Sequence, residues 1–398
     1  MVFLTSLHAW WKRLARIRLI LIPGVVLVAA SGFVFLASRS GQSEQTLVLP
    51  APTGPYAVGR MEEDWTDQSR IDPLASQAGM KRELVIWVWY PSERAPGAEA
   101  APYLPAQWAQ ASTQQSSATI ETHSVENAPL STALARYPVL IFEPGLGNMP
   151  TQYTTLLEDL ASHGFIIFAI TPTYSADVVV FPDGRVADAT SAGSPDNAPN
   201  PQAAGNRLVT VWAQDVIFVM NQLDRLNATR DSMWSQHLDL AHLGVFGHSF
   251  GGATATQVCQ MDARCKAGID LDGALFGDVM QTGLSKPFMV IQSDRDTCST
   301  SSCRSFQSEV QAILRPVPGD ERYHLSIKNT AHLNFSDYAV TLSSARGTGE
   351  LGSIDGVRGL QITRAYVRAF FDTYLNGIPS PLLQGPSSAY PEVQFLTP

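Results

Sequence analysis

The stretch Leu243-Gly244-Val245-Phe246-Gly247-His248-Ser249-Phe250-Gly251-Gly252 decides the fold of this chain. An apolar run typical of a buried strand ends in a G-x-S-x-G pentad, and the small residues after it are typical of the start of a helix. Such a strand–turn–helix strains the backbone of the central serine, and flanking glycines let the strand and the helix pass closely. The pattern therefore predicts that Ser249 is a nucleophile beside a helix N-terminus, which favours negative charge.

Apolar runs on both sides of this turn alternate with segments of helical spacing. The predicted strands are residues 84–90, 137–142, 164–170, 243–246, 267–271, 288–291 and 324–327, and the predicted helices are residues 151–163, 207–226 and 356–375. Continuous apolar strands separated by helices are typical of a parallel sheet that is buried on both faces. We therefore expect one α/β domain over residues 56–398, with residues 183–206 as a long surface loop.

The N-terminus differs from the rest of the chain in charge and hydropathy. Residues 1–18 carry four basic and no acidic side chains, and residues 19–38 follow as an apolar stretch of twenty residues. A helix of this length can cross the hydrocarbon layer, and a basic flank keeps the N-terminus in the cytoplasm. We expect a transmembrane signal-anchor over 19–38, a linker over 39–55 and an exported body. Secretion after cleavage of a signal peptide is the alternative.

Charge and cysteine content restrict the partners of the exported body. The formal net charge of −9 argues against nucleic acid as a partner. The four cysteines fit an oxidising compartment, and local pairing predicts the disulfides Cys259–Cys265 and Cys298–Cys303. Only the second pair comes near zinc-ligand spacing, so we expect no metal. No G-x-G-x-x-G follows the first predicted strand, so we expect no dinucleotide or other organic cofactor.

A serine nucleophile needs a base, and the base needs an orienting carboxylate. Two histidines follow Ser249 in the sequence. His324 lies within an apolar run and is expected to pack in the core, whereas His332 lies in a polar loop and is the predicted base. Two carboxylates fit the role of the acid equally well on position alone: Asp272, beyond one predicted strand, and Asp296, beyond the next.

The oxyanion hole is expected to consist of two backbone N–H groups. One is the N–H of Phe250, the residue after the nucleophile. The other is the N–H of Leu146, in the flexible Gly145-Leu146-Gly147 segment that follows the strand ending at Phe142.

Several segments together resemble one known family, the platelet-activating factor acetylhydrolases of the plasma and intracellular type II group. The resemblance extends over residues 52–345 and is most specific at the pentad and its flanks, residues 247–254. The other similar segments are residues 54–59, 137–147, 160–165, 268–272 and 331–337.

The resemblance implies an α/β-hydrolase fold and a calcium-independent serine esterase that cleaves short or oxidised acyl chains from phospholipids through an acyl-enzyme. It also implies that Asp272 is the acid, because Asp272 stands at the position of the family's catalytic aspartate. Pro144 stands where the family has histidine, which leaves the substrate open. A broad carboxylesterase, lipase or polyester hydrolase would use the same residues. A peptidase and a non-catalytic hydrolase-like binding module are further alternatives.

Overall fold

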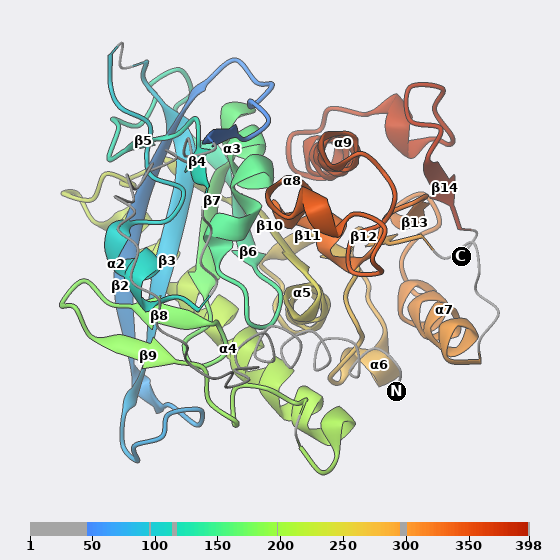
Figure 1. The fold of residues 1–398 in the computed structure, drawn as a ribbon, viewed down its shortest axis with the longest axis horizontal. Coiled ribbons are helices and arrows are strands. Elements are labelled where there is room, and N and C mark those ends of the chain that lie inside the picture. Colours follow the sequence, from blue (N-terminus) through green and yellow to red (C-terminus); the bar gives the residue numbers. More distant parts are fainter. Residues whose placement is uncertain (1–45, 95–96, 114–117, 197, 295–300, 397–398) are drawn as a thin grey trace, which may run out of the picture.

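The structure, a computed structural model, is shown in Figure 1. It describes residues 46–94, 97–113, 118–196, 198–294 and 301–396. The predicted signal-anchor over 19–38 lies outside the described residues, as do the basic segment 1–18 and residues 39–45 of the linker. Among the residues that are described, no helix combines the length and the apolar character that crossing a membrane requires.

A ten-stranded sheet forms the centre of the molecule, in the order β14-β13-β12-β11-β10-β6-β7-β3-β2-β5 (Figure 1). Its inner strands are mutually parallel: β13 (Arg322–Ile327), β12 (Phe288–Gln292), β11 (Cys265–Leu271), β10 (Leu238–His248), β6 (Tyr137–Glu143) and β7 (Ile166–Thr171). Antiparallel strands flank them: β3 (Lys81–Ser92) and β2 (Ala57–Ile71) on one side and β14 (Val393–Phe395) on the other. The short β5 (Val125–Glu126) pairs with β2. The prediction of a mostly parallel α/β sheet is confirmed.

Helices cover both faces of the sheet. On one face lie α3 (Thr154–Ser162) and α9 (Gly356–Leu375), and on the other lie α4 (Pro201–Ala228), α5 (Phe250–Met261) and α7 (Ser301–Leu314) (Figure 1). Successive residues of a strand point to opposite faces of the sheet. Phe142 and Phe246 belong to the first core, which lies between the sheet and α3 and α9, whereas Ile141 and Val245 belong to the second core, on the face of α4, α5 and α7. Each such fully buried apolar side chain contributes about 1.5–3 kcal/mol to stability.

The remaining elements are short. Two small sheets pair β1 (Thr46–Val48) with β4 (Thr119–Glu121) and β8 (Val178–Val180) with β9 (Val186–Asp188). The short helices are α2 (Ala106–Ala111), α6 (Val279–Thr282), α8 (Tyr338–Thr341) and the 3₁₀ turns η2 (Pro150–Tyr153), η3 (His332–Phe335), η4 (Ser343–Ala345) and η5 (Pro381–Leu383).

The prediction that residues 183–206 form one long loop is wrong at both ends. β9 occupies residues 186–188, and α4 begins at Pro201. The helix begins there because the Asn200 side chain accepts a hydrogen bond from the Ala203 N–H at 3.0 Å and because Pro201 suits the first helical turn.

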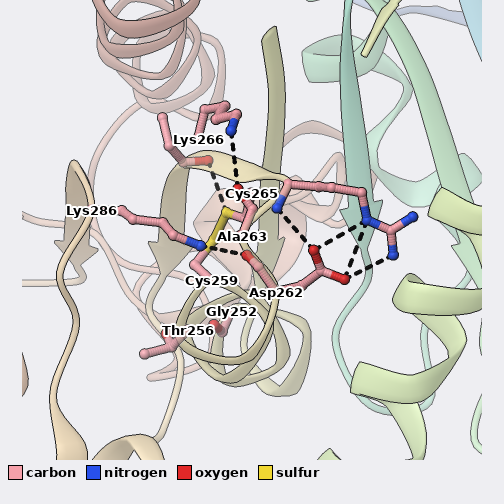
Figure 2. The surroundings of a disulfide bond; sticks show 10 residues. Gly252, Thr256, Cys259, Asp262, Ala263, Cys265, Lys266 and Lys286 are labelled. Carbon is pink, nitrogen blue, oxygen red and sulfur yellow. Dashed lines mark hydrogen bonds and ion pairs between the residues drawn. A yellow bond between two sulfur atoms is a disulfide. The ribbon is translucent and has the colours of Figure 1, made fainter. Parts of the chain in front are cut away.

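A disulfide joins the end of α5 to the start of β11, and Figure 2 shows its surroundings. The Cα atoms of Cys259 and Cys265 are 5.1 Å apart. The intervening turn is stabilised by the Arg264 N–H, which donates to the Asp262 carboxylate at 2.8 Å, and by the Lys286 ammonium, which donates to the Asp262 carbonyl. The predicted Cys259–Cys265 bond is confirmed.

The second predicted disulfide, Cys298–Cys303, stays a prediction. Cys298 lies outside the described residues, and the Cys303 side chain is not described.

Replacing both Cys259 and Cys265 by alanine should lower the unfolding temperature without unfolding the domain. The loop that this disulfide closes is short, so its loss should cost about 2 kcal/mol. Activity should fall as well, because β11 leads directly to Asp272. Calorimetry of the variant and of the native protein, both under non-reducing conditions, measures the difference. Free thiols at both positions in protein recovered from an oxidising compartment would contradict the prediction.

Candidate active site

The predicted nucleophile elbow, residues 247–252, lies between β10 and α5. Ser249 has φ 57° and ψ −120°, a left-handed conformation that costs about 1–3 kcal/mol in a non-glycine residue. A Cβ atom added to Gly251 would lie 2.1 Å from the Glu143 carbonyl oxygen, and one added to Gly252 would lie 1.9 Å from Asp270 Oδ1. Only glycine fits at these two positions, and their close packing holds the serine in its strained conformation.

The structure brings Ser249, His332 and Asp272 into one chain of hydrogen bonds. Ser249 Oγ lies 2.9 Å from His332 Nε2, and His332 Nδ1 lies 2.8 Å from Asp272 Oδ2. The other oxygen of the Asp272 carboxylate accepts from the N–H and the hydroxyl of Ser293, at 2.8 and 3.0 Å. Because an ionised carboxylate only accepts, Nδ1 of His332 carries the proton and Nε2 is free to accept the serine proton.

The other candidate carboxylates have different partners. Asp270 is fully buried, and its Oδ1 accepts from the Gly273 N–H at 2.7 Å. Burial raises the pKa of Asp270 well above its ordinary value. Asp294 accepts from the Asn329 N–H at 2.6 Å. Asp296, the alternative acid, lies outside the described residues.

His324 is buried in β13, as its apolar context predicted, and its exposed fraction is 3%.

One N–H group in the loop after β6 has no acceptor among the residues that the structure describes. The N–H of Gly145 donates to Tyr153 Oη, that of Gly147 to the Ser175 carbonyl and that of Asn148 to the Gly145 carbonyl. Within the described part of the chain, the N–H of Leu146 has no such acceptor, nor does that of Phe250 at the start of α5. These are the two groups predicted for the oxyanion hole.

Two further residues of the site were not foreseen from the sequence. His248 is fully buried, with Nδ1 2.8 Å from Tyr153 Oη and Nε2 2.9 Å from the carbonyl oxygen of His332. Burial and the neighbouring His332 lower the pKa of His248 to about 3, so its ring is neutral. The pentad marks His248 as adjacent to the nucleophile, but no local pattern points to Tyr153, which comes from η2.

An apolar cluster lies beside the oxyanion residues. The ring of Phe250 packs against Trp212 and Phe276, with centroids 4.9 and 5.4 Å away. Leu146 packs partly buried against the same cluster. The site therefore places the two backbone N–H groups beside a cluster of buried aromatic rings.

Glu143 is the last residue of β6, and its carbonyl oxygen lies against the elbow glycines Gly247 and Gly251. Its side chain is fully buried, and among the described residues neither carboxyl oxygen has a hydrogen-bond partner. Burial raises the pKa of Glu143 well above its ordinary value, and the nearby Asp215 adds to this effect.

Comparison with known proteins identifies relatives over most of the chain. The family described as "Platelet-activating factor acetylhydrolase, isoform II" matches residues 41–179 and 219–377. A protein of Arthroderma benhamiae named "Probable 1-alkyl-2-acetylglycerophosphocholine esterase" is 27% identical over 388 residues, which cover 88% of this chain and 94% of that protein. The platelet-activating factor acetylhydrolase of Cavia porcellus is 27% identical over 272 residues, which cover 63% of this chain and 60% of that protein.

A solved structure also resembles the whole body. The ferulic acid esterase from Streptomyces cinnamoneus superposes with a TM-score of 0.75 and 32% sequence identity, over 88% of this chain and 99% of that one. These relatives are carboxylic ester hydrolases by name, and the family match includes the elbow and the His332 loop. This chain is therefore a serine ester hydrolase, and it belongs to the platelet-activating factor acetylhydrolase isoform II family.

Proposed function

We propose that Ser249, His332 and Asp272 are the catalytic triad. The observation that carries this proposal is the unbroken pair of hydrogen bonds, 2.9 and 2.8 Å, from the serine hydroxyl through the imidazole to the buried carboxylate. A serine held this way next to a base is activated for attack on a carbonyl carbon. Asp272 keeps the ring of His332 in the required tautomer and stabilises the imidazolium that forms.

In the first half of the reaction, His332 Nε2 takes the proton from Ser249 Oγ as that oxygen bonds to the ester carbonyl carbon. The bond from this carbon to the alcohol oxygen then breaks, and the alcohol leaves with the proton from His332. In the second half, His332 takes a proton from a water molecule as the water oxygen bonds to the acyl carbon. The bond from this carbon to Ser249 Oγ then breaks, and His332 returns the proton to Oγ, which restores Ser249 and releases the carboxylic acid.

The N–H groups of Leu146 and Phe250 are proposed to bind the oxyanion of both tetrahedral intermediates. Their lack of protein acceptors in the described structure supports this role. Losing one such donor typically costs about 2.7–4 kcal/mol of transition-state stabilisation.

For the substrate, we propose esters with short or oxidised acyl chains, with phospholipids as the first candidates. The names of the Arthroderma benhamiae and Cavia porcellus relatives support this class. A second candidate is an aromatic acyl ester of the feruloyl type. It is supported by the ferulic acid esterase structure and by the ring cluster of Trp212, Phe250 and Phe276 beside the oxyanion groups. A broad carboxylesterase or polyester hydrolase is the remaining alternative, and a peptidase or a non-catalytic module is less well supported.

Ser249→Ala should abolish both ester hydrolysis and labelling by a fluorophosphonate, because it deletes the one attacking oxygen. Ser388→Ala, at an exposed serine, is the matched control and should retain both. The native enzyme is assayed on aryl esters of graded chain length, on a 1-alkyl-2-acetylglycerophosphocholine and on methyl ferulate. The ratio of kcat/KM for the glycerophosphocholine ester to kcat/KM for methyl ferulate distinguishes the two substrate classes. Turnover by the Ser249→Ala variant would refute the mechanism.

Asp272→Asn should lower kcat by about 10⁴-fold, because an amide favours the wrong tautomer of His332. Asp296→Asn is the matched comparison and should cost far less. Steady-state kinetics of both variants on one short aryl ester measure the difference. If the two effects are reversed, the acid follows β12 instead of β11.

We also propose that the body over residues 56–398 is exported and tethered by residues 19–38. The disulfide between Cys259 and Cys265 supports export, because disulfides persist in oxidising compartments. The basic flank of the apolar stretch supports the orientation.

A reporter fused after Pro398 tests this topology. One that works only outside the cytoplasm should be active, and one that works only inside it should be silent. The opposite pattern would contradict the orientation. N-terminal sequencing of the membrane and released fractions separates a retained anchor from a cleaved signal peptide, which is the alternative.

A further inference from the structure

A second chain of hydrogen bonds runs behind the triad. It begins at the loop that carries Leu146, where the Gly145 N–H and Asn148 Nδ2 both reach Tyr153 Oη, at 3.0 and 2.9 Å. It continues from Tyr153 Oη to His248 Nδ1 at 2.8 Å and from His248 Nε2 to the His332 carbonyl oxygen at 2.9 Å. The chain thus connects two loops that lie far apart in the sequence.

The count of donors fixes the direction of this chain. Two N–H groups donate to the Tyr153 hydroxyl, which fills its acceptor positions, so its own proton points to His248. Nδ1 of His248 therefore accepts, and the single ring proton sits on Nε2. That proton is donated to the His332 carbonyl, so every group in the chain is satisfied in one arrangement.

Packing around the chain leaves little room for other arrangements. Tyr153 and His248 are 1% and 0% exposed. The Tyr153 ring packs against Phe142 with centroids 4.8 Å apart, and the His248 ring lies 4.5 Å from the ring of His332. A Cβ atom added to Gly145 would lie 3.1 Å from His248 Nδ1 and 3.2 Å from Tyr153 Oη.

A neutral His248 also suits the chemistry. The reaction creates an imidazolium on His332, and a second positive charge 4.5 Å away would oppose it. Burial keeps the pKa of His248 at about 3, so no such charge forms at neutral pH.

We propose that Tyr153 and His248 are positioning residues that hold the Leu146 N–H and the backbone of His332 in fixed register around Ser249. The inference rests on the proposed triad and oxyanion hole, and it adds to them a physical link between the two. Oxyanion donors and a general base act together only if both stay in place through the reaction, and a displacement of about 1 Å can cost on the order of 10²-fold in rate.

Tyr153→Phe tests the link, because it removes one hydroxyl and keeps the ring. We expect kcat on a short aryl ester to fall about tenfold or more, with KM within about twofold of the native value. Affinity for a trifluoromethyl ketone, which forms a tetrahedral adduct with the serine, should weaken in proportion to kcat/KM.

Tyr90→Phe is the matched control. It removes another buried tyrosine hydroxyl, which donates to the Ala128 carbonyl at 2.7 Å in the second core. This variant should lose comparable thermal stability and keep both kcat and analogue affinity. If Tyr153→Phe behaves like Tyr90→Phe, the positioning role is overturned.

A substitution at His248 tests the same chain of hydrogen bonds without changing Tyr153. In His248→Gln the amide N–H can still donate to the His332 carbonyl, but the amide oxygen lies one atom further from Cβ than Nδ1 and does not occupy the position that accepts from Tyr153, so this variant should also lower kcat. In this background Tyr153→Phe should cost less than it costs in the native enzyme, because the connection between the two loops is already broken. Full additivity of the two effects would overturn the chain. Ser249→Ala distinguishes the positioning role from the proposed triad. If Ser249→Ala is inactive and Tyr153→Phe is fully active, only the positioning role is overturned.

Discussion

The close passage of α5 over the sheet is the constraint on which the site depends. Gly251 and Gly252 leave no room for a Cβ atom against the Glu143 carbonyl and the Asp270 carboxylate. The helix therefore starts in contact with the ends of β6 and β11, the two neighbours of β10. Because those strands end there, the loops that follow them carry Leu146 and Asp272 to the serine. The close packing of α5 thus determines where Ser249, Leu146 and Asp272 lie. It also holds Ser249 in its strained conformation.

The fourth part, the loop of His332, comes from β13, which is not a neighbour of β10 in the sheet. Backbone hydrogen bonds, such as that from the Leu333 N–H to the Glu350 carbonyl, hold this loop, and side-chain bonds place it against Ser249. Asp272 holds the ring from one side, and His248 holds the backbone carbonyl from the other. A base fixed at both its ring and its backbone can exchange protons with Ser249 without a loss of alignment.

The sequence predicted the parallel core and the elbow because their signals are local: continuous apolar runs and a glycine pattern. The sequence also distinguished the predicted base His332 from the packed His324, because the polar loop around one and the apolar run around the other are local signals as well. β2 was not predicted, because its polar stretch Glu62-Glu63-Asp64 becomes a strand only by pairing with β3. Tyr153 could not be found either, because its role follows from contacts with loops that are distant in sequence.

Asp270 and Asp272 lie only two residues apart, yet their surroundings differ. Among the described residues, His332 Nδ1 and the N–H and hydroxyl of Ser293 all donate to Asp272. Such bonds stabilise a charged carboxylate in a buried site. Among the described residues, Asp270 accepts from the Gly273 N–H and packs under Gly252, and burial raises its pKa well above the ordinary value. Residues two apart share a face in a regular strand, but Asp272 follows Leu271, the last residue of β11, and its φ of 53° takes its side chain out of that alternation and toward His332.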